Sequence, residues 1–413
     1  MSESGSTTYG ITPATTDKRV PALDGVRGLA IVLVLINNVY PNRPPLSAFD
    51  YNVAHLANCG WIGVDLFFVL SGFLITGILY DTKGGTHFFR TFYLRRILRI
   101  FPLYYGTLFC VYFVFPHFMH QEQQTKYLLS RQAPFEWTYF ANLGYVLRGY
   151  PPFSTVQFWS LAVEEQFYFV WPFLVFFLTR KRLMTVCCAG LVLALALRIA
   201  WLTNGGTASA MYMLTPFHAD GLAVGALIAL VMRGPDGLKP LERWVGPVAA
   251  MCTPIAAVAL YFDQFTLNPV RHGPLYAVCF TCVDLGFGAL MVATLARPHG
   301  MLDRVFSSRT LGFLGRYSYA MYVFHGFVLW VFQRYVPWMA SPPSVFGTRI
   351  PASIAVLLIV VICTVGLAFA SWHLYEKQFL KLKRFVRYSR KVDPTRGAPG
   401  DTMDVPRASL SAP

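Results

Sequence analysis

The chain has 413 residues, of which 55% are hydrophobic, 16% are aromatic and only 13% are charged. Soluble globular proteins carry about 25% charged residues, so this composition excludes an ordinary soluble protein and predicts a polytopic membrane protein. The net charge of +15 does not indicate nucleic acid as a partner, because the basic residues cluster in short segments between apolar runs. That pattern is typical of cytoplasmic loops in membrane proteins.

The cysteines point to packing rather than to chemistry. All of the eight cysteines except Cys59 lie within apolar runs, including the pair Cys279 and Cys282. Cysteine in such a setting behaves as a small buried hydrophobic residue. We therefore expect neither a disulfide framework nor a metal site.

The apolar runs predict an all-α fold. Residues 1–20 are rich in Ser, Thr and Gly, and we expect a flexible cytoplasmic arm without a cleavable signal. Apolar stretches of about 20 residues, the length that crosses a bilayer, follow along the chain. We predict about ten transmembrane helices with both termini in the cytoplasm, at 21–40, 61–80, 98–118, 159–178, 183–202, 216–232, 244–262, 274–296, 313–334 and 351–374.

This topology depends on the stretch 133–147. It is moderately apolar but short, and it contains Glu136, Asn142 and Gly144, so a span, a re-entrant piece and an interfacial helix are all compatible with it. If it spans, the basic cluster at 180–182 falls outside, against the preference of Lys and Arg for the cytoplasm. If it does not span, every later basic loop falls inside, and we therefore interpret it as non-spanning.

The predicted transmembrane domain covers residues 21–376, and residues 377–413 form a tail. The tail begins as a basic, partly amphipathic segment that suits the anionic inner leaflet. Beyond Val392 it is rich in Pro, Gly, Ser and Thr, which indicates disorder.

The first helix carries polar residues at its start and deep within its apolar run. Asp24 and Arg27 lie at the start of the helix, and we expect Asn37 and Asn38 to lie deep inside it. At 1.5 Å per residue, Arg27 and Asn38 are about 16 Å apart along the axis. Because an unpartnered amide in hydrocarbon costs free energy, we expect Asn38 to reach a buried functional chamber.

Two further spans carry carboxylates. Asp65 lies in the outer third of the second span and Ser71 near its middle, whereas Glu164 and Glu165 lie one to two turns inside another span. Neighbouring residues diverge by about 100° on a helix, so we expect one of the two glutamates to face the interior. The alternatives are local capping or pairing by Asp65, helix packing at Ser71, and structural salt bridges at the glutamates.

Arg96 and Arg99 are three residues apart and share a helix face at the membrane surface. Their planar guanidinium groups suit phosphate, and the alternative is a topology signal that binds lipid headgroups. His325 lies in the middle of a span, where it is either functional or a hydrogen-bonded packing residue.

These stretches resemble, in order, the motifs of the acyltransferase-3 family of integral membrane acyltransferases. The resemblance covers about residues 20–380 and rests on Leu23-Asp24-Gly25-Val26-Arg27-Gly28, on the segment Gly63 to Ile75, on Arg96-x-x-Arg99 with Pro102, on Trp159 to Glu164 with Gln166-Phe167-Tyr168, and on Tyr317-Ser318-Tyr319 leading to His325.

The resemblance implies a multi-pass protein of the bacterial inner membrane, surrounded by membrane lipids. It implies cytoplasmic acyl-CoA as the donor, and a hydroxyl of a carbohydrate, glycolipid or similar molecule as the acceptor. The catalytic candidates are Asn38, Asp65, Glu164, Glu165 and His325. The donor-binding candidates are Arg27, Ser71, Arg96 and Arg99.

One departure from the family affects the mechanism. The family has a histidine eleven residues after the first-helix arginine, and that position is Asn38 here. An amide cannot act as a general base, so we expect Glu164 or another group to activate the acceptor. The competing hypothesis is a transporter-like or catalytically silent relative, which acyl-CoA turnover by the purified protein would distinguish.

Overall fold

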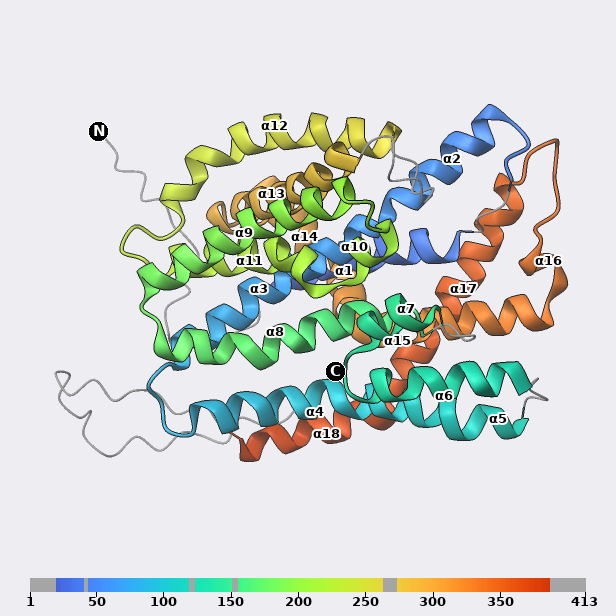
Figure 1. The fold of residues 1–413 in the computed structure, drawn as a ribbon, viewed down its shortest axis with the longest axis horizontal. Helices are drawn as coiled ribbons and strands as arrows, with labels where there is room; N and C mark the ends of the chain where they lie inside the picture. Colours follow the sequence, from blue (N-terminus) through green and yellow to red (C-terminus); the bar gives the residue numbers. More distant parts are fainter. Residues whose placement is uncertain (1–19, 41–43, 119–122, 151–154, 263–272, 387–413) are drawn as a thin grey trace.

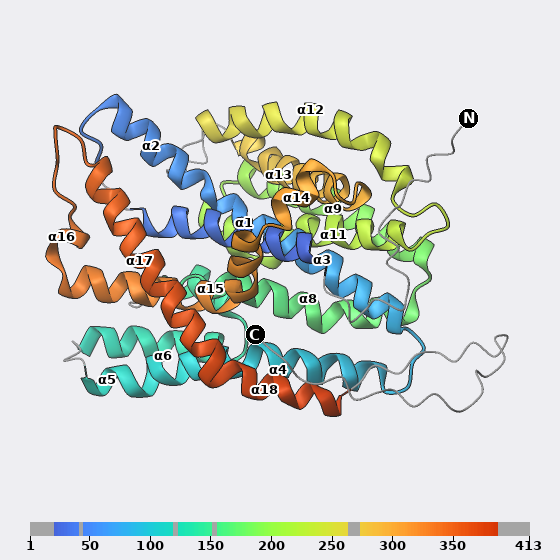
Figure 2. The same ribbon diagram turned by 180° about the vertical axis from the view of Figure 1, so that it is seen from behind.

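The computed structural model describes residues 20–40, 44–118, 123–150, 155–262 and 273–386. These residues form helices and one isolated bridge between Val345 and Thr348, with no strand. Figures 1 and 2 show long helices lying side by side, with α12 (Lys239–Phe262) along one edge and α4 (Phe88–Phe109) with α18 (Lys377–Lys381) along the opposite edge. The all-α prediction is confirmed.

Eight helices in the described ranges are long and apolar enough to cross a membrane, which makes this a polytopic membrane protein. Two more predicted spans are also long helices, α8 (Phe158–Phe177) and α15 (Arg309–Tyr335), but they are more polar. The count of ten and the location of the termini stay predictions. The eight helices are Pro21–Val39, Ala48–Thr82, Phe88–Val114, Arg180–Thr203, Thr215–Met232, Lys239–Tyr261, Pro274–Ala296 and Ile350–Phe385.

The centre of the fold is α1 (Pro21–Val39), which packs against α15 and α3 (Ile62–Thr82). The backbones of α1 and α15 approach closely, because a Cβ atom added to Gly315 would lie 1.7 Å from the carbonyl oxygen of Asp24. Small residues permit such approaches between membrane helices. The contact fixes α1, and with it Arg27, against α15.

The stretch 133–147 is not one helix. It is divided between α6 (Gln123–Trp137) and α7 (Ala141–Arg148). The Glu136 carboxylate accepts hydrogen bonds from the hydroxyls of Tyr112 (2.8 Å), Tyr145 (2.7 Å) and Thr155 (2.8 Å). These bonds join α6 and α7 to the segment before α8 and to the segment after α4. Glu136, one of the polar residues that argued against a span, therefore holds the two helices together.

The prediction placed the start of the third span too late in the sequence. The structure places the helix start at Phe88, ten residues before the predicted start, so Arg96 and Arg99 lie inside α4. The helix continues through a π-helical segment, Cys110–Val114, into α5 (Phe115–Phe118). Hydropathy alone missed the first turns because arginines interrupt their aromatic residues.

Basic side chains form ion pairs and hydrogen bonds at the helix ends on one side of the bundle. Arg233, after α11 (Ala219–Met232), pairs with both oxygens of Asp81, from its Nε and Nη2 atoms at 2.6 Å each. The Lys83 ammonium donates to the carbonyl oxygen of Leu178 at 2.6 Å. Cations at helix C-termini satisfy carbonyl groups that lack helical partners. The predicted arm 1–20, except Val20, and the tail beyond residue 386 lie outside the described residues.

Candidate active site

One pocket brings together six of the predicted site residues. Arg27 comes from α1, Ser71 from α3, and Glu164 and Glu165 from α8, while Arg96 and Arg99 come from α4. Tyr319 and Tyr322 of α15 complete the wall. Five helices that are distant in the sequence therefore enclose a single polar pocket.

Glu164 is the most strongly held carboxylate in this pocket. The Ser71 hydroxyl donates to its Oε1 atom at 2.5 Å, and the Tyr168 hydroxyl donates to its Oε2 atom at 3.2 Å. Because Ser160, Glu164 and Tyr168 are spaced by four residues, they share one face of α8. Ser160 in turn bonds the Tyr322 hydroxyl at 2.5 Å, so α8 is joined to both α3 and α15 across the pocket.

Glu165 also lines the pocket, and the prediction that only one glutamate faces the interior is wrong. Successive side chains diverge by about 100°, and both nevertheless line the pocket. The Oε1 atom of Glu165 is buried and has no hydrogen-bond partner within the described part of the chain. This carboxylate is therefore available to a bound molecule.

The arginines give the pocket an excess of positive charge. Arg27 lies 3.4 Å from Asp24. The Arg96 guanidinium lies 5.7 Å from the ring centres of both Phe92 and Tyr168, and its buried Nε atom has no hydrogen-bond partner among the described residues. Arg99 is exposed, so the pocket opens beside it. Guanidinium groups in this arrangement are suited to an anion.

Asn38 lies in a second cavity, with a volume of about 900 Å³. The prediction of a buried chamber at Asn38 is wrong, because the residue is exposed in the last turn of α1 and its amide donates to the Val34 carbonyl at 2.9 Å. Polar and aromatic side chains dominate the lining, among them Asn37, Tyr51, His55, Asn58, Trp61, Gln157, Trp159, Tyr212 and Gln333.

The two cavities share a wall. Val64 and Tyr322 line both of them. The Tyr322 hydroxyl donates to the Gln157 carbonyl at 3.0 Å in addition to its bond with Ser160. A hydrogen-bonded tyrosine and a valine thus separate the arginine pocket from the cavity that contains Asn38.

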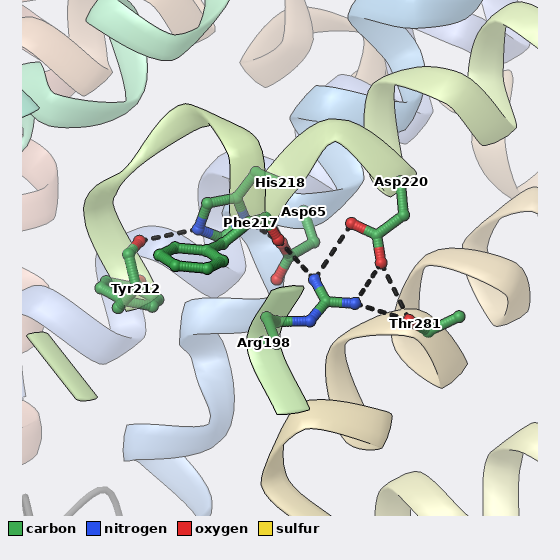
Figure 3. A network of polar contacts seen from close by, with 7 residues as sticks. All are labelled: Asp65, Arg198, Tyr212, Phe217, His218, Asp220 and Thr281. Carbon is green, nitrogen blue, oxygen red and sulfur yellow. Dashed lines mark hydrogen bonds and ion pairs between the residues drawn. The ribbon is translucent and has the colours of Figure 1, made fainter. Parts of the chain in front are cut away.

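Asp65 belongs to a separate buried network, shown in Figure 3. Its Oδ1 atom lies 3.4 Å from the Nδ1 atom of His218, whose Nε2 atom lies 2.7 Å from the Tyr212 carbonyl. Beside them Arg198 pairs with Asp220 and donates to Thr281 at 2.6 Å. Neither cavity is lined by Asp65. Asp65 is therefore paired with a residue from another helix, and its catalytic role stays a prediction.

His325 also stays outside both cavities. It is 1% exposed, and its Nδ1 atom lies 2.7 Å from the carbonyl oxygen of Tyr322 on the same helix. This geometry favours the packing alternative.

Sequence reasoning missed Ser160, Tyr168 and Tyr322 as pocket residues. Ser160 and Tyr168 had a signal, because their spacing of four from Glu164 places them on its helix face. Tyr322 lies three residues before His325, but nothing in the sequence pattern indicated which of the two residues reaches the pocket. Arg198 was missed because its partner, Asp220, lies on another helix.

The fold and the site define the class of protein. It is an all-α membrane protein whose helices enclose a pocket lined by arginines and glutamates. The family model described as an acyltransferase domain, acyltransferase-3, matches residues 20–373. The chain therefore belongs to the acyltransferase-3 family.

The chain is similar to curated bacterial proteins. It is 30% identical over 327 residues to the peptidoglycan O-acetyltransferase OatA of Listeria monocytogenes, covering 75% of this chain and 49% of that protein. It is 31% identical over 394 residues to YrhL of Bacillus subtilis, whose name proposes the same activity, covering 90% of this chain and 56% of that protein.

The chain spans about half the length of these curated relatives. No solved structure matches it significantly. Its apolar helices and its bacterial relatives show a multi-pass bacterial membrane protein.

Proposed function

We propose that this protein transfers an acyl group from acyl-CoA to a hydroxyl of a carbohydrate, such as a peptidoglycan sugar. The observation that carries the proposal is the single pocket in which three arginines meet the hydrogen-bonded pair of Ser71 and Glu164. Anion-binding groups and a potential base then lie within one enclosure, as acyl transfer from an anionic donor requires.

The donor occupies the arginine pocket. Arg96 and Arg99 have no ion pair within the described part of the chain, so their charge is available to the diphosphate of CoA. Arg99 is exposed at the opening, where the polar end of the donor enters, and Ser71 lies farther along beside Glu164.

Glu164 acts as the base in the transfer step. The acceptor oxygen attacks the thioester carbonyl carbon, the hydroxyl proton passes to a Glu164 oxygen, and the carbon–sulfur bond breaks to release CoA as a thiolate. Ser71 and Tyr168 donate to the carboxylate and hold its orientation. Arg27 balances the negative charge that develops on the carbonyl oxygen.

The acceptor occupies the cavity that contains Asn38. Tryptophan and tyrosine rings offer flat apolar faces and its amides offer donors and acceptors, a combination that matches the apolar faces and the hydroxyl groups of sugars. Peptidoglycan is suggested by the name of OatA. Asn38 orients the acceptor here and does not act as a base.

The test is acyl transfer by the purified protein from radiolabelled acetyl-CoA to peptidoglycan fragments. We expect label in the glycan with wild type and its loss with Glu164→Gln. The competing hypothesis of a silent relative predicts no transfer by wild type and a gain with Asn38→His, which restores an imidazole at that position. Label that enters the glycan equally with wild type and Glu164→Gln would reject Glu164 as the base.

A further inference from the structure

A third carboxylate lies beside the buried network of Figure 3. It belongs to Asp284 of α13 (Gly273–Ala296), one turn after Thr281, whose hydroxyl donates to Asp220 at 2.9 Å. The Asp284 side chain packs directly on the backbone of α11, because a Cβ atom added to Gly221 would lie 2.7 Å from its Oδ1 atom. Gly221 is the residue after Asp220, so the two carboxylates are close neighbours.

Asp284 is removed from water and lacks a hydrogen-bond donor at one of its oxygens. The residue is 1% exposed, and its Oδ1 atom has no hydrogen-bond partner among the described residues. A buried carboxylate is strongly disfavoured in its charged form unless a cation or a donor faces it.

The other two acids of the network already use the bases that lie near them. Arg198 of α9 (Arg180–Thr203) donates from both terminal nitrogens to Asp220. The Nε2 atom of His218 lies 2.7 Å from the Tyr212 carbonyl oxygen, which can only accept, so this nitrogen carries a hydrogen. The Nδ1 atom of His218 and the Asp65 carboxylate therefore share at most one further proton. Each base balances one acid, and none is left for the third carboxylate.

The helices that pack against α13 bring no further base to this region. Beyond residue 182 of α9 and residue 243 of α12, Arg198 is the only Lys or Arg in the described helices α3, α9, α11, α12 and α13. The charged residues of α14 (Met301–Phe306) follow the C-terminal end of α13, about 18 Å along the axis from Asp284. The other titratable groups of α13, which are uncharged near neutral pH, are Tyr276, Cys279 and Cys282.

We propose that Asp284 is a proton-binding site, which holds a proton at neutral pH as a neutral carboxylic acid. The neutral acid can donate its hydrogen to the neighbouring carboxylate of Asp220, whereas an ionised Asp284 would place two negative charges side by side. The bound proton then stabilises the packing of α13 against α11. This site does not depend on the proposed function, because none of the charged groups of the network lines either cavity.

Infrared difference spectroscopy of the full-length protein tests the proposal. Dodecyl maltoside is the suitable detergent, because it has no carbonyl group. We expect wild type at neutral pH to show the carbonyl band of a protonated carboxylic acid and Asp284→Asn, which has the same size, to lose it. Asp65→Asn is the matched control and should keep this band, because Asp65 shares its proton with His218.

Thermal unfolding provides a second measurement. A group that keeps its proton in the folded state destabilises the fold relative to the unfolded state as pH rises above its unfolded pKa, about 3.9. We therefore expect the thermal midpoint of wild type, relative to Asp284→Asn, to fall as pH rises from about 5 to about 8. Glu136 titrates in both proteins, so its effect cancels in this difference. Replacing sodium and potassium by choline should leave the midpoint of wild type unchanged.

Three results would overturn the proposal. The first is a wild-type spectrum without the band, and the second is a band that Asp65→Asn loses and Asp284→Asn keeps. The third is a midpoint difference that is constant with pH while wild type responds to sodium or potassium, which would show a metal cation in place of the proton. If Asp284→Asn does not fold, wild type with isotopically labelled aspartate decides, because a band that does not shift with the label belongs to a glutamic acid.

Discussion

Two arginines on one face of α4 show how a short spacing in the sequence becomes a binding surface. A spacing of three places Arg96 and Arg99 on the same side of the helix. Both side chains line the pocket that α4 forms with its neighbours. The aromatic rings of Phe92 and Tyr168 flank Arg96, so its guanidinium is held before any ligand arrives.

Removing either guanidinium should weaken donor binding. We expect Arg96→Ala or Arg99→Ala to raise the dissociation constant of CoA by about tenfold or more, as for the loss of a hydrogen bond to a charged group. Lysine should restore only part of the affinity, because an ammonium cannot form two parallel bonds to phosphate. Calorimetric titration measures this, and unchanged affinity in the double alanine variant would show that the pair contacts lipid or sets topology.

Glu164 and Asn38 should differ sharply in their effects on turnover. Glu164→Gln keeps the size and removes the basicity, so we expect kcat to fall by about 10²–10⁴-fold. Asn38→Ala removes one hydrogen-bonding group from the cavity that contains it, so we expect mainly a rise of about tenfold in the KM for the acceptor. Steady-state rates at matched expression separate the two, and a larger loss of kcat in Asn38→Ala would contradict the placement of the base.

The sequence indicated which polar side chains lie within the apolar spans, but not which of them contact one another. Arg27, Ser71 and Glu164 were identifiable because polar groups within apolar spans are costly and short motifs frame them. The pairing of Asp65 with His218, and the choice of Tyr322 over His325 at the pocket, depend on how separate helices pack. Those contacts are not encoded in the spacing along any one helix.

At the scale of helices, the contact between α1 and α15 depends on the absence of a side chain. Gly315→Ala would place a Cβ atom 1.7 Å from the Asp24 carbonyl oxygen, so the helices would have to separate. We expect a loss of stability of about 1–3 kcal/mol or more, with a lower thermal midpoint in detergent. The matched control is Gly312→Ala on the same helix, where nothing lies within 4 Å of the added atom.

Gly312→Ala should be neutral or slightly stabilising, because alanine loses less backbone freedom than glycine in a helix. Equal behaviour of the two variants would show that α1 and α15 are not in tight contact.

The joint between α6 and α7 should respond to pH through Glu136. Burial raises the pKa of the Glu136 carboxyl above its ordinary value, and hydrogen bonds from Tyr145, Thr155 and Tyr112 oppose that rise. A group whose pKa is raised by folding contributes stability that is fully present below its unfolded pKa, about 4.3, and is lost as pH rises through the raised value.

Glu136→Gln removes this titration. We therefore expect the thermal midpoint of wild type, relative to Glu136→Gln, to fall as pH rises from 4.5 to 7. A difference between the two proteins that stays constant over this range would contradict the pKa shift.

For the whole molecule, the distribution of basic loops predicts the orientation in the membrane. Arg233 and the loop that follows it lie at the end of the bundle that also carries Lys83 and Arg180. We expect this end to face the cytoplasm, because positive loops are retained there.

Single cysteines in a cysteine-free background test the orientation. Asp236→Cys should resist a membrane-impermeant maleimide in intact cells and react after permeabilisation. Ser341→Cys, in the loop after α16 (Pro337–Ala340), should react in intact cells. Labelling of residue 236 from outside would reject the predicted topology.

Tyr322 and Val64 line both cavities, so the barrier between them is a layer of side chains and not a layer of lipid. A barrier of side chains restricts passage between the cavities by size. The Tyr322 ring is held in this layer by hydrogen bonds to Ser160 and to the Gln157 carbonyl. Under the proposed function the acyl group and the acceptor meet across this layer, so we expect the movement of one aromatic ring to limit the size of the acyl group that is transferred.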